Sequence, residues 1–315
     1  MILTPTPIVI HTPLPSPLVT VIIDPQNPYV FEDLTERVLA VAWSPDGKIL
    51  AGGSDHTIQL WQTSDGKPIR TFESGTFSLA WSPDGQIISG GSSTLQLWRV
   101  SDGKLLFSLG GHSDIITAIS WSPKGDIIAS SGWDNDKTVK LWRVSDGTLI
   151  QTLMGHTKGI YDMVWSPDGQ LLASLSKDGD IRLWGARDGN LNRTLVHTVN
   201  GSGTVFALAW SPDGQILASR STREIRLWNI NSGSLLRDLP VGASKCIQGM
   251  AWGLDSQFIA ISNDATIQIL KVDDGSVSRV LSGHKDCVTA LDWSPDGKFI
   301  ATGSWDTTVR LWQIQ

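Results

Sequence analysis

Short apolar runs alternate with turn-forming residues along almost the whole chain, and one unit illustrates the pattern. Residues 38–43 form an apolar run that ends in tryptophan, and a Ser-Pro-Asp-Gly turn follows at residues 44–47. Proline presets φ at the second position of such a type I turn, and glycine closes it. A second run covers residues 48–51, and residues 57–61 alternate with period two, as a strand requires. A second glycine turn and a fourth run complete the unit, which is therefore predicted to be four short strands.

The unit recurs seven times, at spacings of 38, 40, 44, 45, 42 and 41 residues. Its first marker, Trp-Ser-Pro-Asp-Gly or a variant, begins at Trp43, Trp81, Trp121, Trp165, Trp210, Trp252 and Trp293. Its second marker, Leu-Trp, ends at Trp61, Trp98, Trp142, Trp184, Trp228 and Trp312, and the sixth unit has Ile269-Leu270 instead. Thirteen of the fifteen tryptophans repeat in this way, which leaves Trp133 and Trp305. Because a small four-stranded sheet has no closed core, the units must stack face to face.

Further motifs accompany the markers. Gly-His pairs stand at residues 111–112, 155–156 and 283–284, and Asp-x-Thr-x-x-Leu-Trp occurs at residues 55–61 and 306–312. With a four-strand period of about 40 residues, these motifs resemble the WD40 family of β-propellers. The near-identity of the copies is similar to that in bacterial, especially cyanobacterial, members. The resemblance covers residues from about 28 to 315 and implies an all-β fold, a seven-bladed propeller in which each blade is a four-stranded antiparallel sheet.

The seventh unit ends three residues after Trp312 and has no second glycine turn, so it lacks its outermost strand. Counting back from Trp43 places residues 27–31 where such a strand would lie. We expect this segment to pair with the third strand of blade 7 and close the ring, as WD40 propellers are known to do. Residues 27–315 then form a single domain. Residues 1–26 are predicted to be a Pro-rich extended leader, or else a tail without a role in the ring.

The composition excludes several classes of protein. Two cysteines are too few for a disulfide scaffold or a four-cysteine zinc site, and a net charge of −6 argues against a dedicated DNA binder. Cys246 and Cys287 hold equivalent positions in neighbouring blades, where we expect more than about 7 Å between them and therefore free thiols. No apolar run approaches the ~20 residues of a membrane span, and prolines interrupt the apolar N-terminus. We expect no signal peptide, no membrane anchor and a cytoplasmic protein.

Three units combine a histidine, a hydroxyl, an aspartate and the second-marker tryptophan, which resembles the polar tetrad of WD40 blades. The sets are His112, Ser130, Asp134 or Asp136, and Trp142 in blade 3; His156, Ser174, Asp178 and Trp184 in blade 4; and His284, Thr302, Asp306 and Trp312 in blade 7. A buried indole N–H needs an acceptor, and a hydroxyl–imidazole–carboxylate chain supplies one. A hydrolase needs only one such set, so we interpret all three as structural. We expect these blades to be the stiffest and blade 6 the most mobile.

A propeller's function resides on its surface, and the usual docking face of WD40 proteins carries the mouth of the central channel. Three positions per blade resemble the family's contact points. They place eight residues of interest on that face: Arg37, Phe77, Trp133, Tyr161, Lys177, Phe206, Asn263 and Trp305. Blade stacking does not require Trp133 or Trp305, and exposed aromatic residues are favoured interface anchors. We predict an aromatic rim around the mouth; the alternative is that each tryptophan caps its own loop.

We therefore expect a non-enzymatic, monomeric scaffold that presents a rigid mouth to a protein or peptide, with no cofactor, metal or membrane partner. The alternative is an enzyme or small-ligand-binding propeller that uses the mouth. It would need acidic or histidine side chains on the innermost strands, where only Asp162 and Asp292 stand. A partial basic ring precedes the second marker, at Lys140, Arg182, Arg226 and Arg310. Long stems buried between blades explain it equally well, so we expect no nucleic-acid partner.

Overall fold

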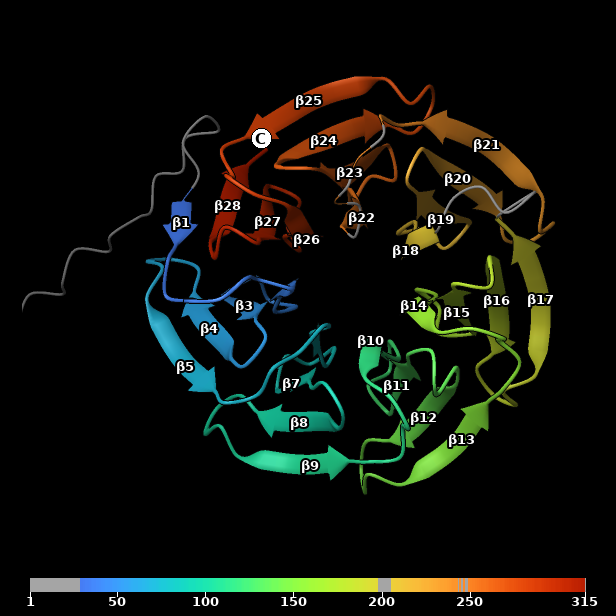
Figure 1. The fold of residues 1–315 in the computed structure, drawn as a ribbon, viewed down its shortest axis with the longest axis horizontal. Helices are drawn as coiled ribbons and strands as arrows, with labels where there is room; N and C mark the ends of the chain where they lie inside the picture. The colour runs from blue at the N-terminus through green and yellow to red at the C-terminus, as the bar shows by residue number, and fades with distance from the viewer. Residues whose placement is uncertain (1–28, 198–204, 243, 245, 247–248, 315) are drawn as a thin grey trace, which may run out of the picture.

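The computed structural model describes residues 29–197, 205–242, 244, 246 and 249–314. Over these residues the chain forms twenty-eight strands and no helix. The strands make seven four-stranded antiparallel sheets, arranged as blades around a central axis (Figure 1). The predicted all-β, seven-bladed architecture is confirmed. Among the described residues, no helix is long and apolar enough to span a membrane.

Six blades run from the axis outwards in chain order, and in blade 7 the outermost strand is β1. The first three blades comprise β2 (Ala40–Trp43), β3 (Ile49–Gly53), β4 (Ile58–Gln62) and β5 (Pro68–Phe72); β6 (Ala80–Trp81), β7 (Ile87–Gly90), β8 (Leu95–Arg99) and β9 (Leu105–Leu109); and β10 (Ile116–Trp121), β11 (Ile127–Gly132), β12 (Val139–Arg143) and β13 (Leu149–Leu153). Blades 4 and 5 comprise β14 (Ile160–Trp165), β15 (Leu171–Ser176), β16 (Asp180–Gly185) and β17 (Leu191–Val196); and β18 (Val205–Trp210), β19 (Ile216–Ser221), β20 (Glu224–Asn229) and β21 (Leu235–Pro240). Blades 6 and 7 comprise β22 (Met250–Trp252), β23 (Phe258–Asn263), β24 (Thr266–Lys271) and β25 (Val277–Ser282); and β26 (Val288–Trp293), β27 (Phe299–Ser304), β28 (Val309–Gln313) and β1 (Tyr29–Phe31).

The ring closes through β1, which supplies the outermost strand of blade 7. Tyr29 pairs with Leu311 and Phe31 with Val309 in an antiparallel ladder. The Phe31 ring also packs against Trp61 of blade 1, with ring centroids 5.1 Å apart. The predicted closure is confirmed, and it leaves no unpaired edge on β28. The predicted leader, residues 1–26, lies outside the described residues.

The Ser-Pro-Asp-Gly turns join the first two strands of a blade, and side chains reinforce them. In blade 1 the Ser44 hydroxyl donates to Asp46 Oδ1 over 2.7 Å and accepts a hydrogen bond from the Ile49 amide over 2.9 Å. Gly47 closes the turn at φ +69°, a conformation that glycine adopts without strain. Blade 6 has Ser256 at the glycine position, with φ +58°.

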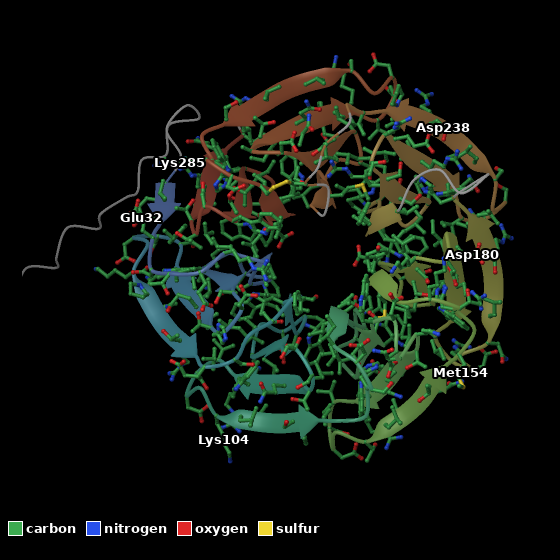
Figure 2. The ribbon with its side chains drawn as sticks, viewed as in Figure 1. Glu32, Lys104, Met154, Asp180, Asp238 and Lys285 are labelled. Carbon is green, nitrogen blue, oxygen red and sulfur yellow. A yellow bond between two sulfur atoms is a disulfide. The ribbon has the colours of Figure 1, made fainter. Side chains whose placement is uncertain are left out.

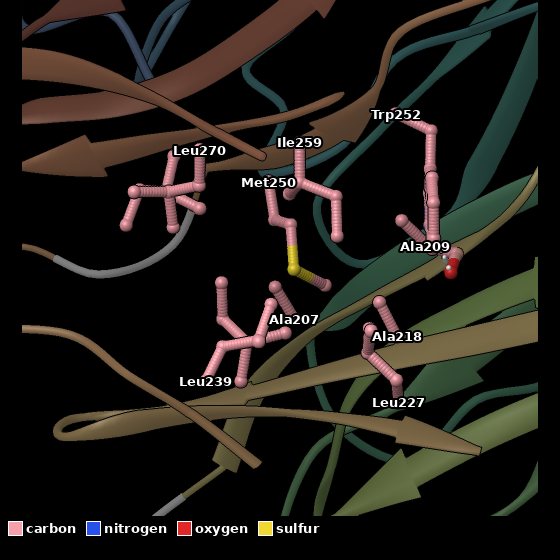
Figure 3. Close-up of a cluster of buried hydrophobic side chains, with 11 residues drawn as sticks. Ala207, Ala209, Ala218, Leu227, Leu239, Met250, Trp252, Ile259 and Leu270 are labelled. Carbon is pink, nitrogen blue, oxygen red and sulfur yellow. Dashed lines mark hydrogen bonds between the residues drawn. The ribbon is translucent and has the colours of Figure 1, made fainter. Parts of the chain in front are cut away.

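The hydrophobic core consists of seven clusters, each lying between two adjacent blades. Figure 3 shows the one between blades 5 and 6, where Met250, Trp252 and Leu270 face Ala218 and Leu227. Leu270 stands where the other blades have the second-marker tryptophan. Since each cluster needs both neighbours, the blades bury their apolar surface only by closing into the ring.

The antiparallel order gives the ring two different ends. The turns between first and second strands and between third and fourth strands lie at one end, here called the turn face. The loops between second and third strands, and the connections from one blade to the next, lie at the other end, here called the mouth face. The eight predicted contact residues lie on these loops or at the adjoining ends of strands.

The expectation of two free thiols is wrong. Cys246 and Cys287 form a disulfide with a Cα–Cα distance of 5.5 Å, well inside the limit assumed for neighbouring blades (Figure 2, yellow). The blades converge toward the axis, and β22 and β26 are in contact there. The Val288 amide also donates to the Asp264 carbonyl over 2.8 Å, which ties the start of β26 to blade 6.

Candidate partner-binding site at the channel mouth

The polar tetrads pin the connections between blades on the mouth face. In blade 4, Trp184 Nε1 donates to Ser174 Oγ over 2.8 Å, and that hydroxyl lies 2.8 Å from His156 Nε2. The other histidine nitrogen, Nδ1, lies 3.1 Å from Asp178 Oδ2. Because the Asp178 carboxylate only accepts hydrogen bonds, His156 Nδ1 carries a proton and donates it to Asp178.

Blade 7 repeats the arrangement with a threonine. Trp312 Nε1 donates to Thr302 Oγ1 over 2.8 Å, and this oxygen lies 2.7 Å from His284 Nε2. His284 Nδ1 lies 2.9 Å from Asp306 Oδ2. The indole, hydroxyl, imidazole and carboxylate of this tetrad therefore all have a partner, which is the condition for burying polar atoms at low cost.

In blade 3 the two alternatives are decided: the tetrad aspartate is Asp136, and Asp134 is wrong. His112 Nδ1 lies 2.9 Å from Asp136 Oδ1, and His112 Nε2 lies 2.8 Å from Ser130 Oγ. The loop after β11 is two residues longer than its counterparts in blades 4 and 7, so the aspartate comes later in sequence. Asp134 instead accepts a hydrogen bond from the Gly159 amide over 2.8 Å and pairs with Lys177 Nζ over 2.9 Å.

In all three tetrads the pKa of the aspartate lies below its ordinary value. Burial alone would raise the pKa of Asp136, but hydrogen bonds from Thr138, Ser113 and His112 outweigh it and lower the pKa to about 2. Similar bonds, against the same effect of burial, lower the pKa of Asp178 and Asp306. Burial also lowers the pKa of the His284 imidazole.

The tetrad hydroxyls are unsuited to attack a substrate. Ser130, Ser174 and Thr302 are each 0% exposed, and each already bonds an indole and an imidazole. A catalytic nucleophile must reach its substrate, which these oxygens do not. The arrangement is a structural one.

Two other blades also supply an acceptor for the second-marker tryptophan: blade 1 with a residue that the sequence pattern does not identify, and blade 5 with Ser219, which the pattern does identify and beside which a four-residue insertion displaces His197. In blade 1, Trp61 Nε1 donates to Asp33 Oδ2 over 2.6 Å. In blade 5, His197 Nδ1 lies 2.6 Å from Ser219 Oγ, which accepts from Trp228 Nε1 over 2.8 Å. His197 therefore reaches the tetrad position despite its displaced spacing. The signal for Asp33 was a buried indole in need of an acceptor.

A cavity of 540 Å³ opens on the axis at the mouth face, and residues from all seven blades line it. Its aromatic side chains include a continuous stack across blades 3, 4 and 5. The Trp133 and Tyr161 rings pack edge-on with their centroids 4.9 Å apart, and the centroids of the Tyr161 and Phe206 rings are 5.1 Å apart. Phe77 and Trp305 line the same cavity from blades 2 and 7, and they are 41% and 43% exposed.

Charged side chains surround this aromatic mouth. Lys177 Nζ lies 5.6 Å from the centroid of the Trp133 ring, and the same ammonium pairs with Asp134. Arg37 lies 6.0 Å above the Trp305 ring and makes a two-pronged bond to Asp55. Arg37 lines the cavity. Lys177 borders it through Trp133, and Asn263 at the end of β23 does not line it.

Trp133 and Trp305 hold equivalent positions in their blades. The Trp133 amide donates to the Ile115 carbonyl over 3.0 Å, and the Trp305 amide donates to the Cys287 carbonyl over 2.9 Å. Lys177 makes the same bond, over 2.9 Å, to the Gly159 carbonyl. These backbone bonds fix where each loop begins, so Trp133 keeps its place on the rim although the tetrad aspartate of its blade is Asp136.

A larger cavity, of 1040 Å³, lies on the turn face around blade 4. It opens where Gly185 and Ala186 replace the longer side chains, such as Arg99 and Val100, that follow the second marker elsewhere. Turn residues of blades 3 to 5 line it, and its two tryptophans, Trp165 and Trp210, are buried. Size alone thus favours the turn face, but exposed aromatic anchors favour the mouth, and exposed anchors rather than volume supply binding energy at interfaces.

The comparisons with known proteins agree with this architecture. Residues 75–234 match the family model described as "IFT122 first beta-propeller", and residues 27–62 and 275–313 match the one described as "WD domain, G-beta repeat". The chain belongs to the WD40-repeat family.

Several characterised WD40 proteins are similar to this one. "Cell division cycle 20.1, cofactor of APC complex" of Arabidopsis thaliana is 28% identical over 284 residues, which cover 88% of this chain and 54% of that protein. "Transcriptional corepressor LEUNIG_HOMOLOG" of the same plant is 24% identical over 110 residues, 33% of this chain and 14% of that protein. "Protein Notchless" of Drosophila melanogaster is 53% identical over 34 residues, 11% of this chain and 7% of that protein. The chain thus spans about half or less of the length of these relatives.

The innermost strands of this WD40 ring carry two carboxylates that join blades. Asp162 Oδ2 accepts a hydrogen bond from the Leu208 amide of blade 5 over 2.7 Å, and Asp292 Oδ2 accepts one from the Trp43 amide of blade 1 over 2.9 Å. Burial raises the pKa of Asp162 to about 6 and that of Asp292 to about 7. They come from blades 4 and 7, and among the described residues no three His, Cys, Asp or Glu side chains converge as a metal site would require.

Proposed function

We propose that this WD40 propeller is a non-enzymatic scaffold whose mouth face binds a protein or peptide. The observation that carries the proposal is the aromatic cavity on the axis, lined from all seven blades and stacked from Trp133 through Phe206. Its rim residues sit on loops that backbone bonds and tetrads hold in place. A partner therefore pays little ordering entropy on the scaffold side when it binds.

The relatives support the same class of function. Two are named as a cofactor of a complex and as a corepressor, roles that are carried out through contact with other proteins. The buried tetrad hydroxyls support a non-enzymatic role. The proposal includes a cytoplasmic, monomeric protein. It also includes the absence of a nucleic-acid partner, which the acidic net charge supports.

Crosslinking tests which face the partner occupies. Lysines stand on both faces: Lys177 and Lys285 on loops of the mouth face, and Lys67, Lys104 and Lys124 on the turn face (Lys104 and Lys285 are labelled in Figure 2). The full chain would be captured from a lysate of its source with a lysine-reactive crosslinker, and the linked residues mapped by mass spectrometry. The proposal predicts crosslinks enriched at Lys177 and Lys285. Crosslinks concentrated on the turn-face lysines would place the partner on the turn face instead and contradict it.

A further inference from the structure

Asp162 places a carboxylate in the mouth cavity at a position where the other blades have small residues. These residues, three before each first-marker tryptophan, are Ala40, Ser78, Ala118, Ala207, Gly249 and Ala290. In blade 2 the Ser78 hydroxyl accepts the Ile119 amide of the next blade over 3.1 Å, which is the same bond that Asp162 makes to the Leu208 amide. An uncharged side chain therefore suffices to join the blades, and the charge of Asp162 requires another explanation.

The Asp162 carboxylate has no cationic partner among the described residues. Its Oδ1 accepts the Met163 amide and its Oδ2 accepts the Leu208 amide, each over 2.7 Å. Each oxygen retains room for a further hydrogen bond, because a carboxylate offers about four acceptor sites. Burial raises the pKa of Asp162, and no neighbouring cation among the described residues opposes that rise.

The charges that line the mouth are therefore unbalanced. Arg37 is the other charged residue among the described residues of the cavity wall, and it is already paired with Asp55 over 2.7 Å. Asp162 is thus the one charged side chain of this described wall without an opposite charge. A cationic group of the partner would complement it.

The carboxylate lies below the aromatic rim, within reach of a long side chain. Leu208, whose amide it binds, follows Phe206 by two residues in β18, so this bond lies about 7 Å further along the strand from the mouth. Asp162 is partly exposed and lines the cavity, so a side chain entering from the mouth can reach it. The depth is close to the length of an extended lysine or arginine side chain, whose methylenes pack well on aromatic rings.

The rim also shows that its aromatic faces hold cations. Lys177 Nζ lies 5.6 Å from the centroid of the Trp133 ring, and the Arg37 guanidinium lies 6.0 Å from that of Trp305. A cation near an aromatic face is attracted by the ring quadrupole. A second basic group that passes the rim would therefore meet favourable rings on its way to the carboxylate.

We propose that the mouth takes up a lysine or arginine side chain of the partner and pairs its charged end with Asp162, which rests on the proposed function of that face. The stem passes the Tyr161 and Phe206 rings, and the ammonium or guanidinium group donates to the free acceptor sites of the carboxylate. Salt screens an ion pair in this partly enclosed cavity less than one on the open surface. The mouth therefore favours a peptide or loop with a protruding basic residue over one with a neutral residue of the same shape.

Two short peptides that differ only in charge test the proposal on the purified full chain. Acetyl-Gly-Arg-Gly-amide carries the cation, and acetyl-Gly-citrulline-Gly-amide has a neutral side chain of nearly the same shape. An NMR titration of the isotopically labelled protein would follow the Met163 and Leu208 amides, which donate to Asp162. We expect these signals to shift with the arginine peptide, which should bind about tenfold more tightly than the citrulline peptide. Equal affinities, or no shift of these amides, would overturn the proposal.

Two matched variants show whether Asp162 is the carboxylate that pairs with the cation. Asp162→Asn removes the charge at constant size and should remove most of the preference for the arginine peptide. Asp292→Asn removes the other inner-strand carboxylate, which is absent from the described residues of the cavity wall, and should retain the preference. A preference that persists in Asp162→Asn, or that is lost in Asp292→Asn, would overturn the assignment. The comparison of the two peptides on the parent decides the proposal even where Asp162→Asn does not fold.

Failure of this inference is distinguishable from failure of the proposed function, because the titration uses no partner from a lysate. A partner crosslinked at Lys177 and Lys285, together with equal affinities for the two peptides, would leave the mouth as the docking face. It would remove only the basic side chain from the account.

Discussion

Blades 6 and 7 are neighbours in the ring, and they are held together in opposite ways. Blade 7 has the full repeat, with its turn, its tetrad and Trp312, but its outermost strand β1 comes from the other end of the chain. Blade 6 is one continuous segment, yet it lacks the proline turn, the tetrad and the second-marker tryptophan. Ser244 bonds to Asp264 within blade 6, Arg220 ties blade 6 to blade 5, and the disulfide ties it to blade 7. The difference teaches that the repeat stabilises a blade from within, and that contacts with neighbours take over where the repeat is lost.

The largest expected effect comes from removing residues 1–34, which supply the non-covalent closure of blade 7. The deletion removes Phe31 and Leu34, both buried, and Asp33, the acceptor for Trp61. Loss of two large buried side chains costs about 2–5 kcal/mol each, so we expect at least about 4 kcal/mol of destabilisation. Urea unfolding of the truncated and full chains measures it. Equal midpoints for the two chains would show that closure by β1 contributes nothing.

A smaller effect is expected when blade 7 is made to resemble blade 6 by Trp312→Leu. The substitution empties part of a buried cluster and leaves the Thr302 hydroxyl without its indole donor. We expect a loss of about 3 kcal/mol in the free energy of unfolding. Trp305→Leu in the same blade, at an exposed position, is the matched control and should change it by less than about 0.5 kcal/mol. Similar losses for the two variants would contradict the assigned roles of these tryptophans.

The smallest effect concerns the inner strands, where blade 7 has Asp292 and blade 6 has Ala251 at the same position. Burial keeps the Asp292 carboxyl protonated up to about pH 7, whereas in the unfolded chain it ionises near its ordinary pKa of 3.8. The folded state therefore holds more protons between these values, and stability falls as pH rises from about 4 to about 7. Asp292→Asn should remove this decline, so the variant gains stability relative to the parent as pH rises from 4 to 8. Parallel unfolding free energies for parent and variant across this range would rule the effect out.

The fold was predictable because the same pattern of strands and turns occurs seven times in the sequence. The seven first markers identify the seven blades, and the glycine turn missing from the seventh unit identifies the need for a closing strand. The tetrads of blades 4 and 7 follow from the same register. The repeat carries this information because each blade solves the same packing problem with the same residues.

The failures occur where a loop departs from the repeat. The loop after β11 has two extra residues, so the tetrad aspartate of blade 3 is Asp136 and not Asp134. The spacing in the sequence alone did not decide between these two aspartates. Asp33, the acceptor for the Trp61 indole, lies outside the register, so only the need of that buried indole for an acceptor could have identified it. His197 also lies outside the register and contacts Ser219, which is the acceptor for the Trp228 indole. The disulfide was missed because the average distance between neighbouring blades does not predict how closely two blade connections approach each other near the axis.

The central claim is that Trp133 and Trp305 serve binding and not folding. The most direct measurement compares the parent with Trp133→Ala/Trp305→Ala for both the melting temperature and the amount of crosslinked partner captured. Leu191→Ala/Leu235→Ala, at exposed positions on the outer strands β17 and β21, is the matched control. The account predicts a melting temperature within about 2 °C of the parent and a loss of most capture for the tryptophan variant, with capture retained by the leucine variant. Full capture by the tryptophan variant, or its failure to fold, would contradict the claim.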